Sequence, residues 1–206
     1  MNKSKISFVK LLGYNAPFFV ALILCYIGFD YIAFYSVRHT SLMVLTLIPL
    51  SFLIEIGLAF FKEAIYKKYL KTGSIKCEFS DYMKEVREPN DFLCRFTIIN
   101  SIKVCLWSFL FIILGIIKTI EYSRQYVVYA KRPEITDLDE LKMIAGKEME
   151  GKKLKLFLII VFASLLLSLL STNASLQEPM LKYLITNISF APIMDFIIIY
   201  YQLNNF

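Results

Sequence analysis

Seven ionisable residues interrupt the long apolar runs of this 206-residue chain, and their side chains are the ones that could do chemistry there. They are Asp30, Glu55, Lys103, Lys118, Glu121, Arg124 and Asp195. Within a membrane-spanning helix an ionisable side chain costs about 2.5–3.5 kcal/mol, so such residues are candidates for binding a ligand or an ion. The alternative is that they form pairs that hold neighbouring helices together.

Three of these residues share one helical face. Lys118, Glu121 and Arg124 recur at intervals of three, so Glu121 can pair with either cation along its own helix. Gln125 extends the same face. A ladder of this kind can line a water-filled cavity, or it can join one helix to the next.

The more isolated acids point to a second possibility, a relay of protons or cations. Asp30 and Glu55 are expected to differ in depth by about 10 Å at 1.5 Å per helical residue, so they should not pair with each other. Either acid could instead pair with Lys103 or Lys118 from another helix, or stay protonated in place. Asp195 is a third acid within an apolar run.

Enzyme chemistry has little support in the composition. The single histidine, His39, excludes a metal site with several His ligands, and the four cysteines include no CxxC pair for zinc or redox chemistry. No Walker loop, dinucleotide fingerprint, GxSxG or HExxH motif is present. We therefore expect a protein without catalytic residues, metal sites or cofactors.

The composition indicates a membrane protein built of helices. Hydrophobic residues make up 57% of the chain and charged residues 19%, whereas soluble domains have about 45–50% and about 25%. A soluble core of this length could not bury so many apolar side chains. The predicted fold class is all-α: one integral membrane domain over residues 1–206, a polytopic transmembrane helix bundle with short cytosolic amphipathic helices.

Apolar runs of about 20 residues are long enough to cross the hydrocarbon of a bilayer. They predict membrane spans at 16–37, 42–61, 96–130, 156–170 and 183–203. The third run is ambiguous, because as one straight helix it would be about 50 Å long. Alternatively, the chain turns near Gly115 and crosses the membrane a second time.

The distribution of Lys and Arg favours two crossings by this run. Such residues collect on the cytoplasmic side of short loops. With a hairpin at 96–130, eighteen of the 23 Lys and Arg residues lie on one side, before the first span and in the stretches 62–95 and 131–155. We therefore predict six membrane helices (five if 96–130 crosses once), with both termini cytoplasmic.

Both polar stretches are expected to contain a short amphipathic helix. In the first, the second span should continue to about residue 70, break at Gly73 and resume near Ser80. The apolar residues at helical spacing in this new helix are Phe79, Tyr82, Met83 and Val86. In the second stretch, Thr136 and Asp139 form a helix-capping signal. The apolar face that follows consists of Leu138, Leu141, Ala145 and Met149.

Four short motifs follow one another between residues 111 and 157. They are Gly-Ile-Ile-Lys at 115–118, Tyr-Ser at 122–123, Arg-Pro-Glu-Ile at 132–135 and Met-Glu-Gly-Lys-Lys-Leu-Lys-Leu-Phe at 149–157. This region resembles a family of uncharacterised integral membrane proteins of Gram-positive bacteria, known as domain of unknown function nine-seven-five. The resemblance covers about a quarter of the chain; it implies a membrane helix bundle and names no reaction.

The expected function is therefore non-enzymatic binding of a protein or peptide partner at the membrane, as by an accessory or immunity factor. The alternative is a small transporter or permease component that uses the intramembrane acids. Membrane lipids are expected contacts, including anionic headgroups at the cytosolic face, which the net charge of +6 would attract. Nucleic acid is not an expected partner.

Overall fold

The computed structural model describes residues 6–39, 41–110, 112–173 and 179–205. All regular structure within these ranges is α-helical, which confirms the all-α prediction. The helices are α1 (Phe8–Tyr14), α2 (Ala16–His39), α3 (Ser41–Thr72), α4 (Phe79–Arg87), α5 (Asp91–Leu110), α6 (Ile112–Lys131), α7 (Leu138–Glu148), α8 (Lys153–Asn173) and α9 (Pro179–Asn204).

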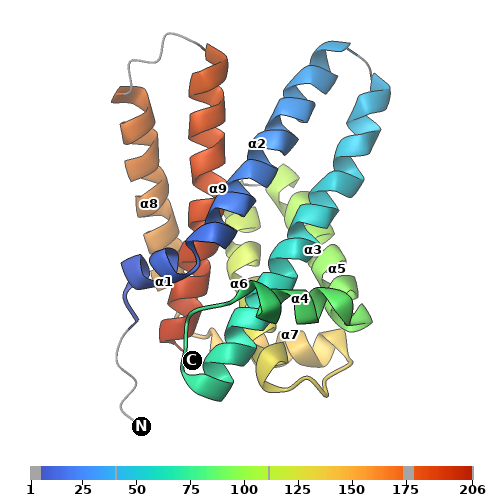
Figure 1. Cartoon of the computed structure of the whole chain (residues 1–206), viewed down its shortest axis with the longest axis vertical. Helices are drawn as coiled ribbons and strands as arrows, with labels where there is room; N and C mark the ends of the chain where they lie inside the picture. The colour runs from blue at the N-terminus through green and yellow to red at the C-terminus, as the bar shows by residue number, and fades with distance from the viewer. Residues whose placement is uncertain (1–5, 40, 111, 174–178, 206) are drawn as a thin grey trace.

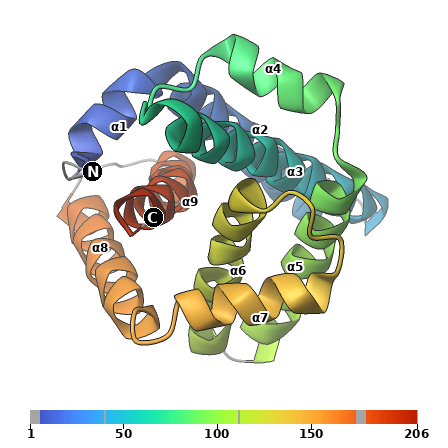
Figure 2. The same ribbon diagram turned by 90° about the horizontal axis from the view of Figure 1, so that it is seen from below.

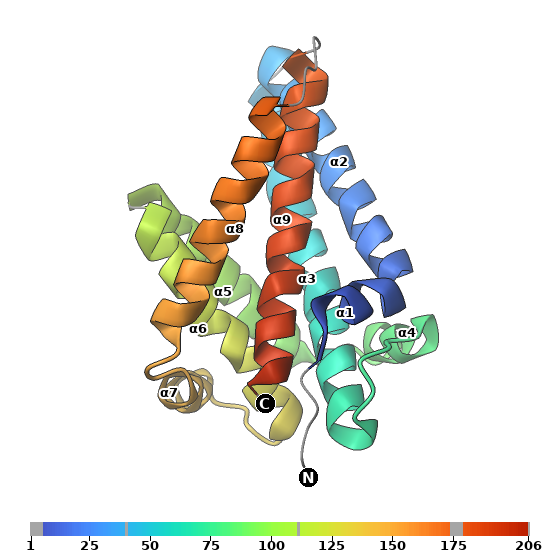
Figure 3. The ribbon, with the colours of Figure 1, turned by 90° about the vertical axis from the view of Figure 1, so that its left-hand side faces the viewer.

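The long helices pair along the chain into three hairpins, α2 with α3, α5 with α6, and α8 with α9 (Figure 1). The short helices α4 and α7 lie at one end of the bundle, together with the described ends of the chain, and we call this the basal end. There the backbone N–H of Ile6 donates to Asn204 Oδ1 at 2.8 Å. At the opposite, distal end, α2 ends and α3 begins, and α8 ends and α9 begins (Figure 3).

The region 96–130 reverses direction, as one of the two alternatives predicted. Asn100 Nδ2 on α5 donates to Gln125 Oε1 on α6 at 2.9 Å, and the Tyr126 hydroxyl donates to Thr97 Oγ1 at 3.2 Å, so the two helices are antiparallel. Helix α5 ends at Leu110 and α6 begins at Ile112, so the break falls a few residues before Gly115, near which the turn was predicted.

The end of α3 confirms two predictions about the first polar stretch. The helix continues beyond the apolar run to Thr72, and Gly73 then adopts a left-handed conformation with φ of 69°. Its N–H donates to the carbonyl of Tyr69 at 2.9 Å. Glycine is the residue that ends a helix in this way without a steric penalty at Cβ.

The short helices are mostly as predicted. Helix α4 packs along α3, and α7 crosses beneath α5 and α6 with Leu141 and Ala145 buried (Figure 2). The predicted cap at Thr136 is wrong: Asp137 caps α7 instead, because its carboxylate accepts the N–H of Asp139 at 3.0 Å. Helix α1 was not predicted, and it joins α2 at a bend of 80°.

The buried core is concentrated toward the basal end. It takes in the second half of α3, the second half of α6, the start of α5 and the end of α9. Its large buried side chains include Phe61, Tyr66, Phe96, Tyr126, Tyr129, Phe196 and Leu203. The rings of Phe96 and Tyr126 lie 5.1 Å apart, an arrangement in which aromatic pairs stabilise a core beyond their buried area.

The other parts of the long helices expose large apolar side chains. Examples are Val20, Leu24, Leu53, Leu106, Ile113, Leu158, Phe162, Leu165 and Leu169, all with exposed fractions above one half. Among the described residues, no individual helix combines the length and the apolar composition needed to cross a membrane. Helix α1 and residues 16–29 meet both requirements together, as a bent pair.

Candidate functional site

Two of the predicted acids lie around one lysine in the core. Lys62 Nζ on α3 is 3.1 Å from Asp195 Oδ1 on α9, with side chains 9% and 16% exposed, and it lies 5.3 Å from the centre of the Tyr126 ring. Glu55, seven residues earlier on α3, interacts electrostatically with both charges. From the sequence, Lys62 was assigned to the polar stretch 62–95. Lys103 or Lys118 was expected to pair with Glu55.

Arg124 is the centre of a second buried cluster and is only 2% exposed. Its Nε donates to Glu148 Oε2 on α7 at 2.8 Å, Nη1 to Gln202 Oε1 on α9 at 2.9 Å, and Nη2 to the carbonyl of Asn205 at 3.2 Å. Gln202 in turn donates to Ser123 Oγ at 2.9 Å. Arg124 therefore joins three helices through hydrogen bonds from all three of its guanidinium nitrogens.

The charge of Glu148 is stabilised by this cluster. Partial burial of the carboxyl group disfavours its charged form, but the hydrogen bonds and charge of Arg124 outweigh that effect and lower the pKa of Glu148. Lys131 adds a weaker contact at 3.5 Å. An ionised Glu148 therefore holds α7 against α6.

Glu121 pairs with Lys118, one of the two cations of its own helix that the spacing offered, and not with Arg124. Its carboxylate accepts from Lys118 Nζ at 2.7 Å and pairs with Lys153 at the start of α8. Arg124 lies one turn further along α6 and forms an ion pair with Glu148. The Glu121 side chain is 24% exposed, so this ion pair lies at the surface of the bundle.

The two remaining candidates lie elsewhere. Lys103 on α5 is near Lys142 and Asp139 of α7, where another cation faces it. Asp30 belongs to α2, and its side chain lies outside the described residues. Four of the described candidates, Lys118, Glu121, Arg124 and Asp195, therefore belong to ion pairs at separate helix contacts. Among the described side chains, no group of His, Cys, Asp or Glu is arranged to hold a metal ion.

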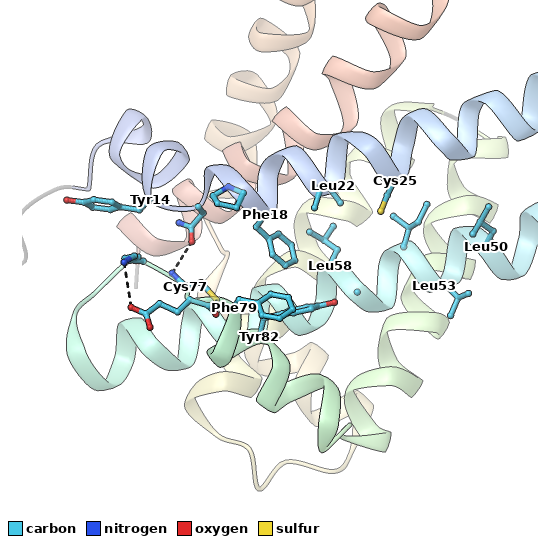
Figure 4. A pocket seen from close by; sticks show the side chains of 17 residues that line it. Tyr14, Phe18, Leu22, Cys25, Leu50, Leu53, Leu58, Cys77, Phe79 and Tyr82 are labelled. Atoms are coloured by element: carbon cyan, nitrogen blue, oxygen red, sulfur yellow. Dashed lines mark hydrogen bonds and ion pairs between the residues drawn. The ribbon is translucent and has the colours of Figure 1, made fainter.

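A cavity lies away from all of these charges. It occupies about 770 Å³ between α2, α3 and the segment that leads into α4 (Figure 4). The apolar side chains that line it include Phe18, Ala21, Leu22, Leu50, Leu53, Ile54, Leu58, Phe79 and Tyr82. Cavities of about 300–1,000 Å³ with mostly apolar walls are the usual sites for small ligands in proteins.

Asn15 fixes the wall at the basal end of this cavity. Its side chain is buried, and Nδ2 donates to the carbonyls of Leu11 and Ile75, both at 2.9 Å. Its Oδ1 accepts the N–H of Cys77 at 2.9 Å (Figure 4). These bonds tie the segment before α4, which we call the strap (73–78), to the junction of α1 and α2.

A second contact fixes the strap where α4 begins. Asp81 accepts the N–H of Glu78 at 2.9 Å and pairs with Lys68 of α3. Slight burial of Asp81 disfavours its charge, but these hydrogen bonds outweigh that effect and lower its pKa. The strap is therefore held from both sides, and the cavity has a defined basal wall.

The charged groups of the lining lie at the basal end of the cavity, and the Tyr82 hydroxyl lies further along, beside Gly57. Lys76 and Glu78 form an ion pair of 3.6 Å whose side chains are more than half exposed. Burial raises the pKa of the Cys77 thiol to about 12, so this cysteine is protonated near neutral pH and is not a nucleophile. The geometry therefore favours binding of an apolar group over covalent chemistry.

The sequence analysis did not identify this cavity. Asn15 and Pro17 were a signal that could have located its basal wall, because Asn and Pro are typical of the start of a helix and here imply a break before α2. The hydrogen bonds from Asn15 to the strap cross about sixty residues of sequence and leave no local pattern.

Comparison with known proteins leaves the function to be argued from this geometry. No protein-family model matches the chain, and neither does any curated protein or solved structure.

Proposed function

We propose that this chain is a multi-pass protein of a bacterial plasma membrane that binds a partner there and has no catalytic role. Helices α2, α3, α5, α6, α8 and α9 are the six proposed spans. The observation that carries the proposal is the set of exposed aliphatic and aromatic side chains on the outward faces of these helices. Large continuous apolar surfaces of this kind are normally covered by lipid or by another protein.

The positions of the charges support a cytoplasmic basal end. The stretches 62–95 and 131–155, which hold most of the Lys and Arg residues, contain α4 and α7 and lie at that end (Figure 1). The described ends of the chain also meet there. An excess of Lys and Arg marks cytoplasmic loops, so both termini are proposed to be cytoplasmic.

Labelling of introduced cysteines tests the membrane topology. In a variant whose four native cysteines are replaced by serine or alanine, cysteines at Ser74 and Lys147 should react only with reagents that reach the cytoplasm. A cysteine at Asn173 should react only from outside. Cytoplasmic labelling at Ser74 combined with external labelling at Lys147 would contradict six spans, and labelling of all three from one side would contradict a membrane-spanning bundle.

Chemical cross-linking in intact membranes tests the partner. A protein or peptide should be captured by the chain and should stay bound in mild detergent. Cross-linkers placed on α8, away from the cavity and the basal end, serve as the control for random collisions. Repeated isolation of an uncross-linked monomer would argue against the binding role.

Transport of an ion is the second candidate, and one observation favours it. Two acids, Glu55 and Asp195, share the single cation of Lys62 in the core. Against it, the cavity between α2, α3 and the strap is lined by none of the six candidates whose side chains the structure describes. If the cluster is structural, Lys62→Met should destabilise the protein and Lys62→Met with Asp195→Leu should restore most of the loss. Ion flux in vesicles that disappears in Glu55→Gln would instead support transport.

A further inference from the structure

We propose that the cavity between α2, α3 and the strap holds one acyl chain of a bilayer phospholipid, with the lipid headgroup beside Lys76 and Glu78. The inference rests on the proposed membrane location and adds the chemical class of one bound partner. It is carried by the dimensions of the cavity, by the chemistry of its walls and by the position of its polar end.

The cavity is elongated along the helices. Its walls extend from Pro17 to Cys25 on α2 and from Leu50 to Leu58 on α3, which is about 12 Å on each helix at 1.5 Å per residue (Figure 4). A hydrocarbon chain that lies between two such helices contacts apolar side chains over about that length.

Along the two helices the walls offer an occupant few hydrogen bonds, with the Tyr82 hydroxyl beside Gly57 as the exception. Asn15, the buried polar side chain in the lining, already uses its amide group in three bonds to backbone atoms. An extended peptide in this cavity would leave its own N–H and C=O groups unpaired, at a cost of several kcal/mol for each group in the most apolar surroundings. A saturated chain carries no such groups, so the lining favours hydrocarbon over a peptide.

The cavity is polar at one end and apolar at the other, in the orientation that a membrane lipid requires. The exposed Lys76–Glu78 pair is at the basal end, which is the proposed cytoplasmic interface. Leu50 and Leu53 are at the other end of the lining, and Leu53 is 65% exposed, so the cavity opens sideways toward the proposed hydrocarbon. A phospholipid of the inner leaflet could enter there with its headgroup at the strap. The Lys76 ammonium would face the lipid phosphate.

Photo-cross-linking with a lipid probe tests the inference. The protein is reconstituted in vesicles that contain phosphatidylglycerol with a diazirine in one acyl chain, and the labelled peptides are mapped. We expect labelling to concentrate on the cavity walls of α2 and α3. Ala21→Trp, which fills the cavity, should reduce this labelling at least tenfold. Leu24→Trp is the matched control, because Leu24 is exposed on the same helix and is not part of the lining.

Both variants must unfold at the temperature of the parent protein for the comparison to count, and Leu22→Phe replaces Ala21→Trp if the latter does not fold. Labelling spread evenly over the outward faces of all long helices, or unchanged by filling the cavity, would overturn the inference. A polypeptide that cross-links inside the cavity and excludes the probe would also overturn it, while leaving partner binding intact. Failure of the cysteine-labelling topology would contradict the membrane proposal itself, whatever the probe shows.

Discussion

The basal and distal halves of the bundle differ in what they bury. In the basal half, charged and amide side chains such as Arg124, Gln202 and Lys62 are buried and hydrogen-bonded among packed aromatic rings. Beyond these clusters, which is the part we call the distal half, the long helices turn apolar side chains such as Leu24 and Phe162 outward. Apolar side chains such as Met143 are exposed in the basal half as well, so among the described side chains the buried polar clusters are what distinguish that half.

The difference indicates which surroundings each half requires. Buried polar groups are tolerated in water-exposed domains when each finds a partner, and the basal clusters meet that condition. Outward apolar faces are stable where the solvent is itself apolar, because lipid does not penalise an exposed Leu. The comparison can be tested by changing one side chain in each half.

The largest effect is expected from Arg124→Ala. Loss of the guanidinium group leaves Glu148 and Gln202 without their partner beside the core, and breaking a buried charge pair costs about 3–5 kcal/mol of unfolding free energy. Thermal and denaturant unfolding in detergent measure the loss. Arg132→Ala is the matched control. An Arg124→Ala protein as stable as that control would show that the basal half is not organised by this cluster.

The next effect tests the distal half. Phe162 is 64% exposed on α8, and Phe162→Lys would place an ammonium group in hydrocarbon at about 2.5–3.5 kcal/mol if that face meets lipid. The matched change is Met143→Lys on α7 in the basal half, where the side chain is 55% exposed and the new charge should be harmless. Insertion efficiency in membranes is the measurement. Equal insertion of both variants would contradict a difference between the halves.

A smaller effect is expected from Glu121→Ala. Its ion pairs with Lys118 and Lys153 are partly exposed, so the loss should be about 1 kcal/mol or less, rather than the large loss that a buried position would give. Glu134→Ala on an exposed turn is the control in the same unfolding measurement. Glu85 is unsuitable as a control, because it accepts a hydrogen bond from Lys67 at 2.9 Å. A loss as large as that of Arg124→Ala would place Glu121 in the buried network after all.

The smallest effect is expected from Asp81→Asn at the end of the strap, and it should depend on pH. Because the folded pKa of Asp81 is lowered, its charge stabilises the fold fully above the unfolded value of about 3.9, and this contribution is lost as the pH falls through the folded pKa. Asp81→Asn should therefore lower the melting temperature slightly at pH 7, and the difference from the parent should shrink toward pH 3. A difference that is the same at both pH values would mean that the ion pair with Lys68 contributes nothing.

Local patterns in the sequence were sufficient to predict the helices, but they were not sufficient to predict the contacts between helices. The amphipathic spacing around Tyr82, the break at Gly73 and the reversal within 96–130 are properties of short segments, so they could be predicted. The partner of Arg124 could not, because Glu121 and Glu148 are equally suitable acids and only the packing of α7 beneath α6 selects between them. Asp195 and Lys62 are likewise joined by tertiary structure alone.

The hydrogen bonds between Ile6 and Asn204 bring the two described ends of the chain together at the basal end. Ends that lie this close can be joined by a short linker, and new ends can then be opened at the exposed turn 88–90 between α4 and α5. Such a circular permutant would emerge from the ribosome with the α5/α6 hairpin first and the α2/α3 hairpin last. Every hairpin would still enter the membrane from the cytoplasmic side. The order in which the hairpins are synthesised could therefore be changed without changing the direction of any helix.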